Sequence, residues 1–210
     1  MIGRDGYMIP KKIHYCWFGK GKKSKLALKC IRSWRQYCPE YEVIEWNEEN
    51  FDIDMNGYTR MCYAEKKYAY LSDYVRLWVV EKYGGIYFDT DVEVIRSLEE
   101  LLRNDAFFCF ENKQYVASGL GFGSVAHGKV IQAMLKEYEI LLDGKNGVRM
   151  CPKLNTQALV ALGLKQNGRK QNVCEAVIYP MDVLNPYNSA TGKLEKTENT
   201  FPFTGMRQRG

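Results

Sequence analysis

Residues 83–94 read YGGIYFDTDVEV, and this stretch decides how the chain is interpreted. The pair Gly84-Gly85 is expected to end an apolar helix, because glycine adopts the left-handed backbone that many helix ends use. Residues 86–88 form a short apolar run that leads directly into Asp89 and Asp91. The chain leaves its pleat at the end of a strand, so these two carboxylates need not point to opposite faces and can be aimed at one point.

Two carboxylates at such a place are a candidate metal site. Mg²⁺ and Mn²⁺ prefer oxygen ligands, usually take one or two carboxylates, and complete their shell with water and substrate phosphates. In open α/β sheets, ligands of this kind lie beyond the carboxyl ends of the strands. Asp89 and Asp91 therefore suit a metal-diphosphate site, although an Asp-x-Asp pair by itself is also common in ordinary loops.

The apolar helix that precedes this strand carries one charged pair. Asp73 and Arg76 are three residues apart and so share a helix face. Charges in a mostly buried helix must be matched, because their desolvation is costly. Two interpretations remain open. The residues form a plain ion pair facing solvent, or Asp73 accepts hydrogen bonds from sugar hydroxyls while Arg76 donates to an oxygen-rich ligand.

Strands and helices are predicted to alternate along the rest of the chain. The expected strands cover residues 9–18, 41–46, 86–88, 92–95, 106–110 and 176–179. The expected helices run from an N-cap at Ser24 to near Pro39 and over 63–83, 97–103, 129–142 and 155–164, and residues 118–124 are interpreted as a glycine-rich turn. This order predicts an α/β fold with a parallel or mixed central sheet.

The composition is typical of one packed domain. The chain has 210 residues, of which 46% are apolar and 26% charged, so we expect a single domain over residues 1–210. It contains no apolar run of about 18 residues, and residues 1–10 lack the apolar core of a signal peptide, so a cytoplasmic location is expected. The seven cysteines form no C-x-x-C pair, which favours reduced, mostly buried thiols over disulfides or a zinc site.

Basic residues are concentrated near the N-terminus. The net charge is +5, and residues 1–35 hold ten Lys and Arg against one acidic residue, Asp5. Such a segment attracts phosphates, nucleic acid or anionic lipid, or is simply a solvated lysine-rich loop. A nucleic-acid motif is missing, so no nucleic-acid partner is expected, whereas peripheral contact with the inner face of an anionic membrane is compatible with the charge. Of the two histidines, His14 is expected in the core and His127 in a structural or capping role.

Three segments carry a family resemblance. They are IPKKIHYCWFG (9–19), WNEENFD (46–52) and AYLSDYVRLWVVEKYGGIYFDTDVEV (69–94). Together they resemble the DXD sugar transferases, which include fungal initiating mannosyltransferases, bacterial capsular and lipooligosaccharide transferases and, more distantly, the large glucosylating toxins. The resemblance spans about residues 9–142.

The resemblance implies a Rossmann-related GT-A fold with a donor-binding core over about 9–142 and an acceptor or closing region over about 143–210. The implied activity is that of a retaining glycosyltransferase that needs Mn²⁺ or Mg²⁺. It would move a sugar from a nucleotide-diphosphate sugar, with a UDP-sugar as the expected donor, to a saccharide or glycolipid acceptor. The expected setting is the synthesis of surface polysaccharide, such as capsule, in a bacterium.

The resemblance also implies roles for individual residues, which match the family's motifs one by one. Trp17 would stack on the nucleobase, with a core tryptophan as the alternative. Asp73 and Arg76 would hold the donor sugar, Tyr87 would lie beside the donor, and Asp89 and Asp91 would bind the metal. Catalytic roles fall to Asp73, Arg76 and Asp91, and a departing phosphate oxygen would help to deprotonate the acceptor.

Two alternatives accompany this interpretation. Family members often close over the diphosphate with a His and a Ser-Trp pair, and residues 198–210 contain neither His nor Trp. A catalytically degenerate nucleotide-sugar-binding protein is therefore the main alternative. A strand ending in D-x-D also opens the haloacid dehalogenase phosphatases, but these expect Thr or Val where this chain has Glu93, and they place the motif near the N-terminus.

Overall fold

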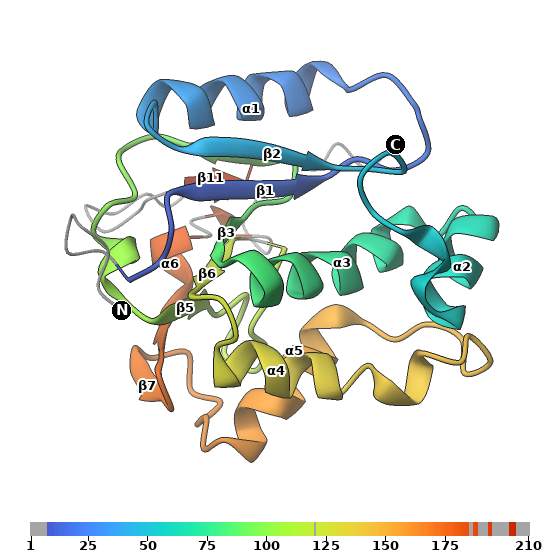
Figure 1. The fold of residues 1–210 in the computed structure, drawn as a ribbon. Coiled ribbons are helices and arrows are strands. Elements are labelled where there is room, and N and C mark those ends of the chain that lie inside the picture. The colour runs from blue at the N-terminus through green and yellow to red at the C-terminus, as the bar shows by residue number, and fades with distance from the viewer. Residues whose placement is uncertain (1–7, 120, 185–186, 189–192, 195–201, 205–210) are drawn as a thin grey trace.

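The computed structural model describes residues 8–119, 121–184, 187–188, 193–194 and 202–204. Figure 1 shows a central sheet with α1 on one side and α3 and α4 on the other. The sheet order is β2-β1-β3-β6-β5-β8-β7. The strands are β1 (Lys12–Cys16), β2 (Glu42–Trp46), β3 (Gly85–Tyr87), β5 (Ala106–Cys109), β6 (Phe122–Ser124), β7 (Gln171–Val173) and β8 (Ala176–Tyr179).

The sheet is mixed, as predicted. Strand β1 pairs in parallel with both β2 and β3, and β5 pairs in parallel with β8. Strand β6 is antiparallel to both β3 and β5, and β7 is antiparallel to β8. Because β1, β2 and β3 run in the same direction, their carboxyl ends meet at one edge of the sheet, where residues 17, 47 and 88 follow.

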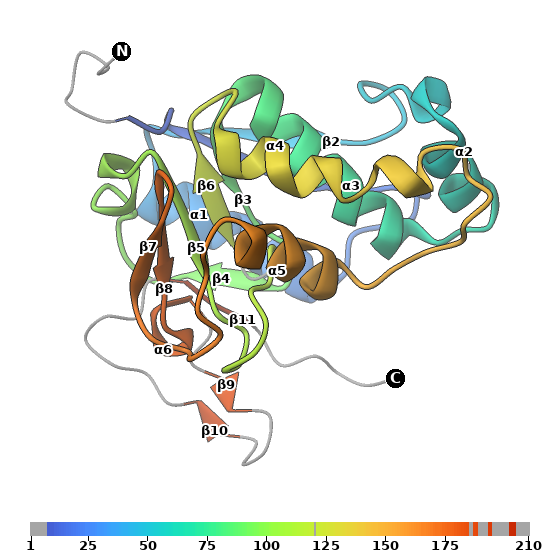
Figure 2. The same ribbon diagram turned by 90° about the horizontal axis from the view of Figure 1, so that it is seen from below.

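Helices cover both faces of the sheet. They are α1 (Lys25–Tyr37), α2 (Gly57–Ala64), α3 (Tyr68–Tyr83), α4 (Lys129–Lys136), α5 (Cys151–Ala161) and α6 (Met181–Leu184), with 3-10 turns η1 (Ile53–Met55), η2 (Leu101–Arg103) and η3 (Glu139–Leu141). One core cluster contains side chains of α2 to α5, and the other contains side chains of α1, η2 and α6. In Figure 2 these helices surround the sheet. The predicted cap of α1 is confirmed, since the Ser24 hydroxyl accepts from the Ala27 amide at 3.1 Å.

Several predicted boundaries are wrong. The helix expected over 63–83 is two helices, separated at Lys66, which has a φ of 56°. The helix expected over 97–103 is the 3-10 turn η2, and α5 begins earlier than expected, with Pro152 in its first turn.

The predicted turn over 118–124 contains strand β6. The strand β4 (Val92–Val94) lies outside the main sheet and pairs antiparallel with β11 (Pro202–Thr204). A further two-stranded ladder joins β9 (Tyr187–Asn188) to β10 (Lys193–Leu194).

The core contains the predicted thiols and histidine. Six of the seven free cysteines are buried and Cys174 is exposed. His14 is fully buried; its Nδ1 accepts from Trp46 Nε1 at 3.1 Å, so Nε2 carries the proton and donates to the Gly84 carbonyl at 2.9 Å. Burial lowers the pKa of His14 to about 4. None of the helices in the described ranges is long and apolar enough to cross a bilayer.

Candidate active site

Arg76 is the centre of the site that the structure assembles. Helix α3 buries its side chain, which is 4% exposed, against the carboxyl end of β3. One guanidinium nitrogen, Nη2, lies 2.9 Å from Asp73 Oδ1 and 3.1 Å from Asp89 Oδ1. Nε donates to the Ser72 carbonyl at 3.1 Å. Burial opposes the charge, but the neighbouring carboxylates outweigh it and raise the pKa of Arg76.

The Asp73–Arg76 pair is therefore not the solvent-facing ion pair that was one of the two interpretations. Asp73 is 17% exposed and Asp89 is 31% exposed, so both acids face a partly open space while the cation between them is covered. Three of the predicted site residues thus come together from the middle of α3 and the end of β3. A buried guanidinium held by two carboxylates is rigid, and it fixes both acids relative to the sheet.

Tyr87 and Asp89 are linked directly. The Tyr87 hydroxyl donates to Asp89 Oδ1 at 3.1 Å, and Arg76 lies over the Tyr87 ring at 4.9 Å from its centroid. Tyr87 is 1% exposed, so it lies beneath the carboxylates and positions them. Asp91 follows on the same connection between β3 and β4 and is half-buried. Contact of Tyr87 with a donor stays a prediction.

The backbone at Gly119 closes one side of this group. A Cβ placed on Gly119 would lie 2.5 Å from Asp89 Oδ2 and 2.9 Å from Arg76 Nη1. The Gly119 carbonyl also accepts from the Asp89 amide at 3.3 Å. The chain can approach the carboxylate this closely because glycine has no side chain there.

Trp17 lines a separate hollow at the same sheet edge. It is half-buried directly after β1, its Nε1 donates to the Gly21 carbonyl at 2.7 Å, and Lys23 Nζ lies 5.6 Å from its ring centroid. The hollow has a volume of about 370 Å³ and is lined by Trp17, Lys20, Gly21, Lys23, Glu45, Asn47, Glu48 and Glu49. Trp17 is thus half-buried: it packs against the core cluster that contains α1, and it also forms an aromatic wall of the polar hollow.

The donor set fits a divalent cation that shares its ligands with a substrate. The contacting group of Asp73, Asp89 and Arg76 has a formal charge of −1, and Asp91, two residues after Asp89 on the same connection, adds a further acid that a dication would neutralise. Among the described residues, no group of three or more His, Cys, Asp or Glu side chains is arranged to hold a metal on its own. Asp89 and Asp91 would supply oxygen ligands, and the remaining positions would be left for phosphate and water.

Sequence reasoning missed a cluster of buried polar groups around the first turns of α5. Cys151, in the first turn of α5, lies 3.0 Å from the Ser118 hydroxyl and accepts from Asn155 Nδ2 at 3.1 Å. Asn155 and Tyr138 are fully buried as well. Burial raises the pKa of Tyr138, and the charges of a nearby thiol and carboxylate add to this effect. The Cys151-Pro152 pair is a sequence signal for the start of α5, because proline favours the first turn of a helix.

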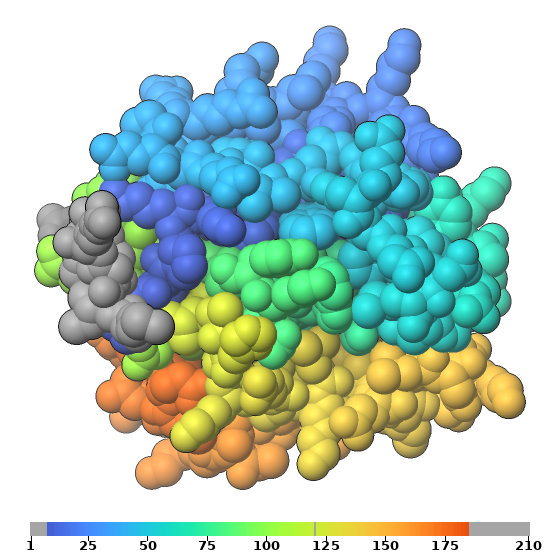
Figure 3. Space-filling view, in the orientation of Figure 1, coloured from blue at the N-terminus to red at the C-terminus, as the bar shows by residue number. Residues whose placement is uncertain are grey.

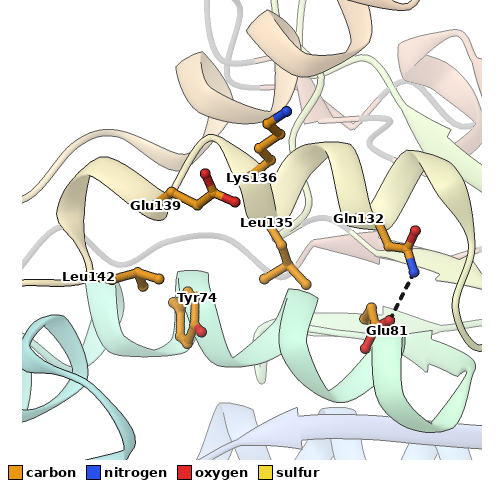
Figure 4. A pocket seen from close by; sticks show the side chains of 7 residues that line it. All are labelled: Tyr74, Glu81, Gln132, Leu135, Lys136, Glu139 and Leu142. Carbon is orange, nitrogen blue, oxygen red and sulfur yellow. Dashed lines mark hydrogen bonds between the residues drawn. The ribbon is translucent and has the colours of Figure 1, made fainter.

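A second hollow lies away from these residues. A groove of about 320 Å³ lies between α3 and α4. Figure 4 shows Leu135 and Tyr74 facing its interior. At one end Glu81 accepts from Gln132 at 3.3 Å and pairs with His127 Nδ1 at 2.9 Å. His127 precedes α4 and is exposed, so it lies outside the Arg76 group. Most of residues 198–210, where the resemblance implies a closing His and Trp that this chain lacks, lies outside the described residues.

The chain matches a known family over the part that contains Asp73, Arg76, Asp89 and Asp91. Residues 24–108 match the family described as "Glycosyltransferase sugar-binding region containing DXD motif". A curated relative, inositol phosphoceramide mannosyltransferase 3 of Schizosaccharomyces pombe, is 32% identical over 106 residues. The alignment covers 47% of this chain and 29% of that protein, so the chain spans under a third of this relative's length.

Two solved structures share the fold. The PaToxG glycosyltransferase superposes with a TM-score of 0.58 at 18% identity, covering 73% of this chain and 69% of that chain. The UDP-bound glycosyltransferase domain of the YGT toxin gives a TM-score of 0.50 at 11% identity, covering 76% of this chain and 69% of that chain. The resemblance to DXD sugar transferases and the GT-A type of α/β fold are thereby confirmed.

Proposed function

We propose that this protein is a metal-dependent glycosyltransferase that moves a sugar from a nucleotide-diphosphate sugar to a saccharide or glycolipid acceptor. The observation that carries the proposal is the buried Arg76, held between Asp73 and Asp89 at the end of β3 and followed by Asp91. This group lies within residues 24–108, which match the DXD family. The name of the UDP-bound toxin domain favours a UDP-sugar donor, and the name of the fungal relative favours a glycolipid acceptor.

The roles of the residues follow from the charge that develops in the reaction. Cleavage of the bond between sugar and phosphate leaves an oxocarbenium-like sugar and a diphosphate with new negative charge. A Mn²⁺ or Mg²⁺ ion held by Asp89 and Asp91 would supply charge neutralisation at the diphosphate. Asp73 accepts hydrogen bonds from the sugar hydroxyls, and Arg76 holds Asp73 and Asp89 in place. Trp17 stacks on the base in the hollow that it lines.

The proposed stereochemical outcome is retention. The acceptor hydroxyl attacks the face of the sugar that the diphosphate leaves, and a departing phosphate oxygen takes its proton. Asp73 and Arg76 then act by orienting the sugar, and no covalent bond to either residue is required. The product is proposed to be a surface polysaccharide or a glycolipid.

A nucleotide-sugar screen tests the proposal. Purified protein is incubated with each UDP-sugar and Mn²⁺, with and without chelator, and the release of UDP is measured; NMR of the released or transferred sugar reports its anomeric configuration. Asp91→Asn should abolish Mn²⁺-dependent UDP release and weaken Mn²⁺-dependent UDP binding. Glu93→Gln removes an acid two residues away that pairs with Lys29 at 2.8 Å, and it should leave both intact.

Three outcomes separate the alternatives. Metal-dependent UDP binding with no turnover of any donor would favour the degenerate binding protein. Metal-dependent binding that survives Asp91→Asn would overturn the metal assignment. Inversion at the anomeric carbon would overturn the proposed course of the reaction while leaving the transferase activity intact.

A further inference from the structure

The outward side of α1 carries a stripe of positive charge. Lys25, Lys29, Arg32 and Arg35 are all exposed, and Leu28, which is 45% exposed, lies among them. The spacing of 3 and 4 residues places the five side chains on one helix face, here called the α1 basic face. The helix sequence KLALKCIRSWRQY contains no acidic residue. Figure 1 places α1 as an outer layer, and Figure 3 shows long side chains projecting from it.

The rest of the protein leaves most of this charge uncompensated. Lys29 pairs with Glu93 at 2.8 Å, but among the described residues no carboxylate lies within ion-pair distance of Lys25, Arg32 or Arg35. Three acids on or beside the neighbouring edge strand β2 are bound to other cations: Glu40 to Lys11, Glu42 to Lys12 and Glu45 to Lys23. The stripe therefore presents a net positive field to solvent.

The face is also rigid. The opposite side of α1 packs Ala27, Cys30, Ile31 and Trp34 into the core, and Trp34 Nε1 donates to the Val92 carbonyl at 2.8 Å. The cations are thus carried on a fixed helix and not on a loop. A flat anionic surface can engage all of them at once, because they share one side of the helix.

We propose that the α1 basic face docks on an anionic lipid membrane. Charge complementarity between the cations and anionic headgroups carries the proposal. Leu28 favours lipid over nucleic acid, because burying an apolar side chain in the headgroup region lowers the free energy of binding, whereas a phosphate backbone offers it no apolar contact. None of the five residues of the face lines the hollow at Trp17, so the proposal stands independently of the proposed transfer reaction. It assigns the membrane contact to one surface, parallel to the axis of α1.

Vesicle sedimentation tests the proposal with the full chain. The vesicles are pure phosphatidylcholine, or phosphatidylcholine with 30 mol% phosphatidylglycerol. Binding is expected to the anionic vesicles alone and to be lost in 0.5 M salt. The variant Lys25→Gln/Arg32→Gln/Arg35→Gln should bind about 100-fold more weakly, at roughly fivefold per charge. The control Lys129→Gln/Lys136→Gln/Lys153→Gln removes three exposed charges from α4 and α5, and should bind within about threefold of the wild type.

Several results would overturn the inference. Equal binding to the zwitterionic vesicles, undiminished binding of the α1 variant, or an equal loss in the control variant would each show that the face is not the docking surface. Release by millimolar inorganic phosphate would indicate a small-anion site, and tighter binding to a 20-base-pair DNA duplex at equal phosphate concentration would indicate a nucleic-acid surface. Mn²⁺-dependent UDP binding and the thermal melt of the α1 variant, both expected to be unchanged, separate this test from that of the transferase proposal.

Discussion

Replacement of Arg76 by methionine tests how the site is held together. Methionine keeps the length and the apolar part of the side chain but leaves Asp73 and Asp89 without the cation between them. Removing one partner of a fully buried ion pair costs about 3–5 kcal/mol. The two acids are 17% and 31% exposed and so retain part of their hydration, which places the expected loss near the lower end, at about 3 kcal/mol.

Urea unfolding of the metal-free protein measures this loss. For a chain of this size, with an m-value of about 3 kcal/mol/M, the midpoint should fall by about 1 M. Arg60→Met makes the same chemical change at an exposed pair, in which Arg60 Nε lies 3.0 Å from Asp54 Oδ1, and it should cost less than about 1 kcal/mol. If the two variants lose stability to the same extent, the guanidinium does not organise the carboxylates and the argument from burial is wrong.

Three further predictions concern other parts of the molecule. Burial lowers the pKa of His14 from 6.5 to about 4, so the stability that the neutral imidazole contributes to the fold is complete above pH 6.5 and is lost as the pH falls toward 4. The unfolding free energy of the wild type should therefore fall by about 3 kcal/mol across this window, and His14→Gln should remove that fall, as measured by urea titration at each pH. Trp17→Ala should weaken Mn²⁺-dependent UDP binding about tenfold, measured by calorimetry, while Tyr37→Ala leaves it unchanged. An equal effect of both substitutions would show that the base does not bind in the hollow lined by Trp17. Gly119→Ala should weaken the same binding by at least about tenfold, because its Cβ would lie 2.5 Å from Asp89 Oδ2, and unaltered affinity would show that this carboxylate is not used.

Local sequence signals predicted the parts of the site that depend on local geometry. A spacing of three on a helix places Asp73 beside Arg76, and the end of an apolar strand places Asp89 at the carboxyl edge of the sheet. The N-cap Ser24 and the helix end at Gly84 follow from the same short-range chemistry. Each depends on fewer than five consecutive residues, which is why the sequence is sufficient for them.

Long-range packing decides the rest, and the sequence does not display it. The contact of Arg76 with Asp89 joins residues 13 apart and is made by the turn at Gly84 and Gly85. The glycines of residues 118–124 predict a turn where strand β6 forms. A Cβ at Gly123 would lie 2.5 Å from the Phe107 ring, so this glycine is a packing requirement of the sheet. The pairing of β4 with β11 depends on residues more than a hundred positions away.

The arrangement of charge explains why Arg76 is buried and the acids are not. A guanidinium exposed beside Asp91 would compete with a divalent cation for the same oxygens, because both are attracted to the carboxylates. Burial on α3 lets Arg76 bind the inner oxygens, Asp73 Oδ1 and Asp89 Oδ1, from behind. The acids are then held in place while Asp73, Arg76 and Asp89 together keep a formal charge of −1, and such a charge attracts a dication together with a diphosphate more strongly than a diphosphate alone. On this argument, UDP should bind weakly without the metal, and Mn²⁺ should raise its affinity in the wild type far more than in Asp89→Asn.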